Sequence, residues 1–330
     1  MFIQVAPMEG VVDFKVRDLL TQIGGVDRTV TEFVRVTNRL HPPKVFYKYA
    51  PELQTGGRTL AGVPVYVQLL GSDPEALLEN AHLAFELGAS GVDLNFGCPA
   101  KTVNRHDGGA TLLKDPSRIF KVVDRLRSSL PAKCPVTAKV RLGFEDKGLH
   151  REIAQAVDEG GASQLVIHAR TRNEGYRPPA HWEYIGYMAD AVTRTRVVAN
   201  GDLWSLKDYA DCVRVSGIRD VALGRALVSR PDLALELKRF ANDGALTGDS
   251  SESSYHGLEW RDVLRRYLFP LFDYYYGQSP RLAVGRLKQS LKALGRNYPE
   301  AVDFFDHVRR ETNGLVVKSL LLKERNSIGL

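Results

Sequence analysis

Short runs of consecutive apolar residues alternate with longer amphipathic stretches over roughly the first 226 residues of the chain. Unbroken apolar runs of this length are typical of parallel strands that are covered on both faces. Between the runs, segments 74–88 and 116–130 place apolar residues at helical spacing, and an Asp-Pro pair of the kind that opens helices begins the second. Eight strands alternating with helices predict an α/β fold, and favour a (β/α)8 TIM barrel over an open doubly wound sheet. The eight predicted strands are 2–9, 28–33, 64–71, 91–97, 135–143, 163–170, 195–202 and 220–226.

The composition changes near residue 245. Segment 245–257, ALTGDSSESSYHG, consists of small and polar residues and is predicted to be a linker. The barrel domain is therefore expected to span 1–244, and a small helical bundle is expected over 258–330. Four amphipathic segments predict the helices of this bundle: 259–277, 280–297, 299–313 and 314–324.

The overall composition is that of an ordinary globular protein, with 44% hydrophobic and 25% charged residues among 330. No apolar run approaches the roughly 20 residues of a membrane span, and the N-terminus does not resemble a signal peptide. Cys98, Cys134 and Cys212 form no CxxC pair, so neither a metal site nor a disulfide framework is predicted. A reducing cytoplasm is the simplest compartment for such a chain.

Positive charge is concentrated in one segment, although the formal net charge is only +6. Segment 281–298 contains no acidic residue, and a helix there could simply present a solvated face. It could equally form a surface for a polyanion such as nucleic acid. The cations of this segment are Arg281, Arg286, Lys288, Lys292 and Arg296.

Polar side chains occur at the C-terminal end of every predicted strand, which is where (β/α)8 barrels place their chemistry. A lone lysine in a strand can snorkel to solvent, and a lone histidine is often structural, but packing does not explain polar groups on all eight strands. After the last two strands, Asn200-Gly201-Asp202 and Gly224-Arg225 combine glycines with a cation, as a phosphate site requires. Lys139 could stabilise the negative charge of a reduced flavin, so FMN is favoured over a simple sugar phosphate. No GxGxxG follows the first strand, so the usual dinucleotide signature is absent.

At this point the chain resembles the tRNA-dihydrouridine synthases, flavoenzymes that reduce uridines in transfer RNA. It is most similar to the C subfamily, which acts on the D-loop uridine at position 16, and TEFVRV (31–36) and HVRR (307–310) support that placement. The matching segments are APMEG (6–10), TEF (31–33), VQLLG (67–71), GVDLNFGCPAKTVN (91–104), GGATLLKDP (108–116), KVRLG (139–143), HART (168–171), ANGD (199–202) and LGRA (223–226).

The resemblance implies that Cys98 is the general acid. Reduced flavin gives hydride to uracil C6, and the thiol gives a proton to C5. An ordinary thiol, with a pKa of about 8.5, is mostly protonated at neutral pH and can therefore donate. Gly97 and Pro99 would hold the loop so that the sulfur faces the base.

The resemblance also implies FMN as cofactor, NADPH as reductant, tRNA as substrate and no stable protein partner. Among the residues that the resemblance assigns to tRNA is Arg309, but its side chain could pair with Asp303 or Asp306, which lie within helical reach. The implied flavin residues are Pro7, Met8, Glu9, Gln68, Lys139 and His168. The implied phosphate residues are Asn200, Gly201, Asp202, Gly224 and Arg225. The implied tRNA residues are Arg35, Asn95, Arg141, Arg286, Lys288 and Arg309.

One departure and two alternatives remain. The chain has Arg105-His106-Asp107 where members of the family usually have small residues, so the sequence does not fix how the Cys98 loop closes. An FMN barrel that reduces a free pyrimidine would need the same barrel residues, but not the basic segment 281–298. An RNA-binding barrel without redox activity would not need Cys98, Lys139 and a phosphate site together.

Overall fold

The computed structural model describes residues 1–242 and 257–327, and the chain forms two compact units. The first unit comprises Met1–Phe14 and Asp27–Leu223, and the second comprises Lys15–Val26 and Gly224–Leu330. Apart from Gly257, the predicted linker lies outside the described residues.

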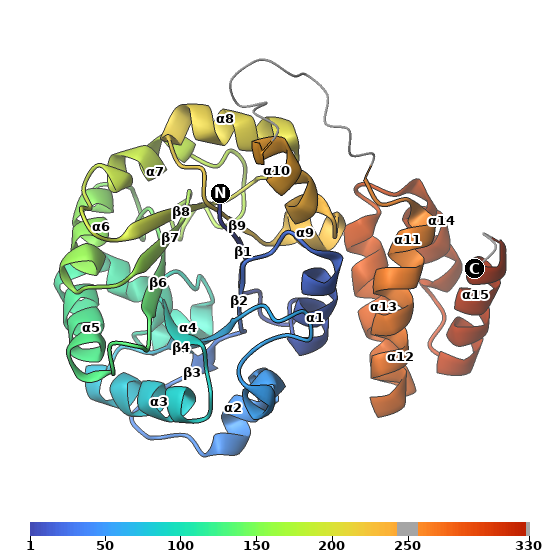
Figure 1. Ribbon diagram of the computed structural model, residues 1–330, viewed down its shortest axis with the longest axis horizontal. Coiled ribbons are helices and arrows are strands. Elements are labelled where there is room, and N and C mark those ends of the chain that lie inside the picture. Colours follow the sequence, from blue (N-terminus) through green and yellow to red (C-terminus); the bar gives the residue numbers. More distant parts are fainter. Residues whose placement is uncertain (243–256, 328–330) are drawn as a thin grey trace. The chain divides into compact units, whose positions relative to one another are not determined.

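Parallel strands form a closed ring in the first unit (Figure 1). Each pairs with the next around the ring, and β9 pairs with β1, so the (β/α)8 barrel is confirmed. Every predicted strand is present within the described residues, shorter at its ends than the apolar run. The ring strands are β1 Ile3–Val5, β2 Arg28–Val30, β4 Val65–Leu70, β5 Gly91–Asn95, β6 Val136–Arg141, β7 Gln164–His168, β8 Arg196–Asn200 and β9 Val221–Leu223.

The second predicted strand, 28–33, is present only as β2, and pairing resumes beyond its predicted end. Its pairing with β4 stops after Val30 and resumes as β3, Val34–Arg35, with one more residue on this side than on β4. This is the arrangement of a β-bulge, which is common at barrel rims. The Thr31 hydroxyl accepts the Gln68 N–H at 3.0 Å, and so replaces a carbonyl that the ladder lacks there.

Helices surround the ring and alternate with its strands (Figure 1). Predicted helices 74–88 and 116–130 are confirmed as α3 and α5, each with an aspartate cap and a proline at the first helical position. The helical elements after β3 in this unit are α2 Pro43–Tyr49, η1 Pro51–Thr55, α3 Pro74–Glu86, α4 Lys101–Arg105, η2 Gly109–Lys114, α5 Pro116–Ser129, α6 His150–Glu159, α7 Trp182–Ala189 and α8 Leu206–Ser216.

The barrel interior contains polar as well as apolar side chains. Arg28 stacks 4.1 Å from the Tyr66 ring and donates to Gln164. Further toward the C-terminal ends of the strands, the fully buried Asp93 carboxylate accepts from Gln68 Nε2 at 2.7 Å and from Thr137 Oγ1 at 2.6 Å. Burial raises the pKa of Asp93.

The second unit is helical in its described residues, and the four predicted segments are confirmed. The first of them contains a π-helical turn, η4 Leu264–Leu268, where the Phe269 N–H reaches back to the Leu264 carbonyl. Pro270 follows at once, and a π-turn accommodates the hydrogen bond that proline cannot make. None of the helices described is long and apolar enough to cross a membrane. The helices are α1 Phe14–Ile23 (which starts one residue before this unit), α9 Arg225–Ser229, α10 Leu233–Asn242, α11 Trp260–Val263, α12 Phe269–Gln278, α13 Pro280–Leu294, α14 Pro299–Val308 and α15 Gly314–Ser327.

Candidate active site

The barrel register brings the predicted polar residues of the middle strands together at one rim. Asn95 is opposite Lys139, Arg141 is opposite His168, and His168 is opposite Asn200. Because side chains alternate across a strand, Lys139 and Arg141 share one face of β6.

Gln68 and Asn95 are joined by their amide groups. Asn95 Nδ2 donates to Gln68 Oε1 at 2.8 Å, and Gln68 Nε2 donates to the buried Asp93 carboxylate. Asn95 Oδ1 accepts the Gly97 N–H at 3.0 Å. These contacts fix the orientation of both amides and connect them to the start of the Cys98 loop.

Lys139 donates from Nζ to Asn200 Oδ1 at 3.2 Å. Burial, reinforced by the charge of Arg141, lowers the pKa of Lys139 to about 8. Within the described residues its hydrogen-bond partner is a neutral amide rather than a carboxylate. A buried ammonium without a carboxylate partner favours an anionic ligand. Such a ligand would raise the pKa of Lys139 back toward its ordinary value.

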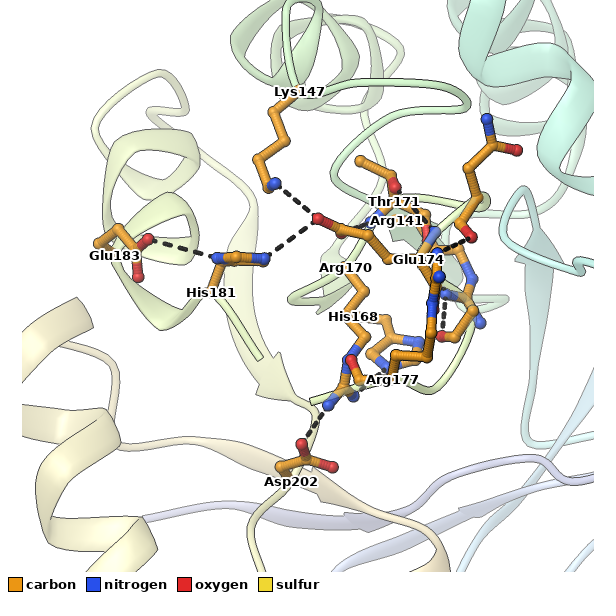
Figure 2. A network of polar contacts seen from close by, with 12 residues as sticks. Arg141, Lys147, His168, Arg170, Thr171, Glu174, Arg177, His181, Glu183 and Asp202 are labelled. Atoms are coloured by element: carbon orange, nitrogen blue, oxygen red, sulfur yellow. Dashed lines mark hydrogen bonds and ion pairs between the residues drawn. The ribbon is translucent and has the colours of Figure 1, made fainter. Parts of the chain in front are cut away.

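The loop after β8 is held firmly. Trp182 Nε1 donates to the Gly201 carbonyl at 2.8 Å, and the buried Arg170 guanidinium forms an ion pair with Asp202 (Figure 2). Gly201 has a φ of +123°, and a Cβ there would lie 3.1 Å from the His168 ring, so this position requires glycine.

Cys98 is buried between the barrel rim and the segment that follows it. It packs with Leu70 and Val103, and its carbonyl accepts from Asn104 Nδ2 at 3.0 Å. Burial raises the pKa of the Cys98 thiol, and Glu9 raises it further, while the cations Arg141 and Lys139 act in the opposite direction. The thiol is therefore protonated at neutral pH, and the charges of Arg141 and Lys139 at the rim act on it.

Arg141 is nearly fully buried, and its guanidinium binds backbone carbonyls from separate loops. Nε donates to the Gly97 carbonyl at 2.8 Å, and one terminal nitrogen donates to the carbonyls of Thr171 and Gly175 at 3.0 and 2.8 Å. Its predicted role was a direct substrate contact. The structure adds a set of loop contacts that the sequence did not reveal.

Sequence reasoning also missed Glu174, which is at the centre of a polar network beside Arg141 (Figure 2). Its carboxylate accepts from Lys147, His181 and the Thr171 N–H. The available signal was the T-x-x-E spacing of residues 171–174, which resembles a capping box.

Among the unusual residues 105–107 that follow the Cys98 motif, Asp107 forms a charged pair with Arg118. Asp107 has a φ of +59°, and Arg118 donates to both of its carboxylate oxygens. Aspartate tolerates this left-handed backbone better than most residues. The pair ties the end of the Cys98 loop to α5.

The remaining predicted residues of the first unit, in the turn after β1 and on β3, are exposed or half-buried. Pro7 and Met8 are half-buried and Glu9 is exposed, in a turn whose next residue, Gly10, donates its N–H to Glu32. Arg35 lies on the short strand β3 and is half-buried.

The predicted tRNA residues of the second unit, Arg286, Lys288 and Arg309, are engaged with protein groups. Arg286 stacks 5.1 Å from the Tyr275 ring, and Lys288 Nζ donates to the carbonyls of Arg309 and Glu311. Arg309 pairs with Asp306 at 3.3 Å, one of the two acidic partners that its sequence position predicted. Gly224 precedes α9 and Arg225 begins it.

Comparison with solved structures gives the same fold. A structure described as DHODH in complex with ferulenol from Eimeria tenella has a TM-score of 0.54 and 14% identity, and the match covers 74% of this chain and 82% of that one. A variant of NCR from Zymomonas mobilis has a TM-score of 0.50 and 12% identity, covering 72% and 86%. At such low identity these similarities show the barrel fold alone.

Sequence relatives are much closer. A tRNA-dihydrouridine(16) synthase of Pseudomonas putida is 50% identical over 326 residues, covering 97% of this chain and 96% of the relative. One from Neisseria meningitidis serogroup B is 46% identical over 318 residues, covering 96% and 92%. The family described as Dihydrouridine synthase (Dus) matches residues 4–253. The chain therefore belongs to the dihydrouridine synthase family.

Proposed function

We propose that this protein reduces the D-loop uridine at position 16 of tRNA to 5,6-dihydrouridine, with FMN as its flavin and NADPH as reductant, in the cytoplasm. The family and the names of the closely similar relatives support the reaction and the position. The observation that carries the mechanism is the buried Cys98 thiol, packed with Leu70 and Val103, in a loop that Arg141 holds at the Gly97 carbonyl.

The rim residues fit FMN. A buried ammonium with a neutral partner suits the anionic ring edge of reduced FMN. Gln68, whose amide is held by Asp93 and Asn95, is proposed to contact the ring on the family resemblance. Pro7, Met8, Glu9 and His168 are proposed to line the flavin. The phosphate is assigned to the glycine-containing loop Asn200-Gly201-Asp202, where the Asp202 carboxylate is occupied by Arg170 and backbone N–H groups remain the suitable donors. Gly224 and Arg225 are proposed as further phosphate ligands on the family resemblance.

Reduced FMN, when bound, supplies the hydride that uracil accepts at C6. Cys98 donates its proton to C5, and burial favours this role because it keeps the thiol protonated at neutral pH. Lys139 and Arg141 then favour the thiolate that remains, since both lower its pKa. Asn95, whose amide is held by Gln68 and Gly97, is proposed to orient the uracil edge.

The uridine must leave its stacked position in tRNA before it can enter the barrel, which costs unstacking free energy. Arg35, Arg286, Lys288 and Arg309 are proposed to offset this cost through contacts to the RNA, largely to phosphates. Such contacts orient the tRNA and thereby select which uridine enters. Arg141 is buried beside the Cys98 loop, so its proposed substrate contact is to the uridine that has entered the barrel.

Dihydrouridine mapping tests the proposal. Transfer RNA from cells that lack this protein should have uridine at position 16, and the purified protein with FMN and NADPH should restore dihydrouridine there. Restoration at another position would contradict the site assignment. A preparation that binds no flavin would favour the RNA-binding barrel, and one that reduces free pyrimidines but not tRNA would favour the small-substrate enzyme.

A further inference from the structure

A turn after β7 is organised by reciprocal hydrogen bonds between Thr171 and Glu174. The Glu174 carboxylate accepts the Thr171 N–H at 2.6 Å, and the Thr171 hydroxyl accepts the Glu174 N–H at 3.2 Å. This is the hydrogen-bond pattern of a capping box, here formed in a turn rather than at the start of a helix.

Lys147 and His181 contact the same carboxylate from outside the turn (Figure 2). Lys147 Nζ lies 2.7 Å and His181 Nε2 lies 3.1 Å from Glu174 Oε1. Although partial burial opposes ionisation, these contacts and the Thr171 N–H lower the pKa of Glu174 to about 2. Glu174 is therefore charged throughout the physiological range and joins the loops after β6 and β7.

The ordered turn presents two carbonyls to Arg141. Thr171 and Gly175, the residues at either end of the turn, accept from the same guanidinium nitrogen. The Nε of that guanidinium donates to the Gly97 carbonyl, one residue before Cys98. An unbroken series of hydrogen bonds thus runs from Glu174 through Arg141 to the backbone that carries the thiol.

We propose that Glu174 is a positioning residue for Cys98. It shapes the turn that holds Arg141, and Arg141 holds the loop that aims the sulfur at the uracil ring. The inference rests on the proposed function, because it assigns Cys98 the role of proton donor. It predicts that Glu174 affects proton delivery and has little effect on tRNA affinity or on flavin reduction by NADPH.

The primary test is Glu174→Ala in a single turnover of the pre-reduced holoenzyme with tRNA. Since misplacement by about 1 Å can cost on the order of 100-fold, dihydrouridine formation should slow by about 10- to 100-fold. The dissociation constant for tRNA and the rate of flavin reduction should change by less than about twofold. Glu174→Gln should recover most of the rate, because glutamine accepts the same N–H in a capping box.

Two further measurements separate positioning from a general structural defect. In a Cys98→Ala background, Glu174→Ala should cause no additional loss of rate, since residues that act through one group are not additive. Alkylation of Cys98 by iodoacetamide, located by peptide mass spectrometry, should be several-fold faster in Glu174→Ala than in the wild type. The buried Cys134 and Cys212 should stay unlabelled, which reports that the fold is intact.

Glu183→Gln is the matched control. Glu183 approaches the other nitrogen of His181, at 3.7 Å, and lies outside the turn 171–175, so wild-type rates and labelling are expected. If Glu174→Ala does not fold, Thr171→Val removes the other half of the reciprocal pair and should produce the same changes to a smaller degree.

Unchanged turnover and labelling in Glu174→Ala would overturn the inference, as would a rate loss that adds fully to that of Cys98→Ala. Failure of the proposed function is a separate result. In that case the wild-type holoenzyme itself would form no dihydrouridine, whereas the alkylation comparison would still report whether Glu174 holds the Cys98 loop.

Discussion

Gly109 lies so close to Cys98 that a Cβ at this glycine would come within 3.0 Å of the Cys98 Cβ. Gly109 also has a φ of +59°, which side chains other than glycine adopt at a cost. Two segments of the loop, eleven positions apart in the sequence, are therefore fixed against each other at the proposed proton donor.

Gly109→Ala is expected to displace Cys98 rather than to unfold the barrel. The added methyl group and the left-handed backbone together should lower the free energy of unfolding by about 1–3 kcal/mol. Single-turnover dihydrouridine formation should fall at least about tenfold, while tRNA affinity stays within about threefold. Rapid-quench product analysis and filter binding measure the two effects, and an unchanged turnover rate would show that the close contact is not needed.

Cys98→Ala should uncouple flavin chemistry from product formation. The variant is expected to retain FMN and to oxidise NADPH, but to form dihydrouridine about 100- to 10,000-fold more slowly, because general acid catalysis contributes factors of this size. Parallel measurement of NADPH oxidation and of dihydrouridine in the same tRNA checks this. Full product formation would remove Cys98 from the mechanism.

Lys139 should make FMN affinity depend on pH. Its pKa is lowered to about 8, so raising the pH through this value removes the charge that favours an anionic ligand. The dissociation constant for reduced FMN, whose ring carries the negative charge, should therefore increase as the pH rises from 7 to 9, by up to about tenfold. Fluorescence titration measures it, and Lys139→Met, with weaker binding at pH 7, should show a flat profile over the same range.

Asp158 should contribute to stability in a pH-dependent way. Its buried carboxylate accepts the N–H groups of Thr193, Arg194 and Thr195, and although burial acts in the opposite direction these bonds lower its pKa to about 2. Asp158→Asn should reduce the free energy of unfolding by about 1–3 kcal/mol at pH 7. Because the native pKa is depressed, the contribution is complete above the ordinary value near 4 and disappears as the pH falls toward 2. Denaturation in urea from pH 7 to pH 3 should show the two proteins converging; a constant difference would rule out the ionised carboxylate as its cause.

Arg286→Glu should weaken tRNA binding without affecting FMN. Arg286 is a cleaner test than Lys288, because Lys288 also holds the carbonyls of Arg309 and Glu311. Affinity should fall and the slope of log K against log salt should decrease by about one unit. Lys121→Glu, an identical charge reversal on an exposed residue of α5, is the control. Equal tRNA affinity of Arg286→Glu and the control would favour the free-pyrimidine reductase.

The sequence was sufficient for the barrel because its strands are continuous apolar runs with polar ends. The sequence could not show that the pairing of β2 with β4 stops after Val30. The stop depends on the Thr31 hydroxyl accepting the Gln68 N–H, and the pattern of apolar residues does not reveal such a contact. The π-turn before Pro270 was hidden for a similar reason: the helical spacing shifts for only one turn.

The candidate site was predictable for residues whose place follows from a single strand. Lys139 and Asn200 follow directly from strand ends, and the structure brings them to 3.2 Å. The loop contacts of Arg141 were not predictable, because its acceptors at 97, 171 and 175 come from two loops whose conformations depend on tertiary contacts.

The helix α1 is built into the second unit although it is synthesised near the start of the chain. Arg266 reaches the Ile23 carbonyl across 243 residues, and the Lys15 ammonium lies over the Tyr274 ring. During translation at about 5–20 residues per second, these contacts cannot form until about 12–50 s after α1 has been made. The nascent chain therefore carries an incompletely packed N-terminal helix through most of its synthesis, and a ribosome that stalled at the end of the barrel would display that helix without its final partners.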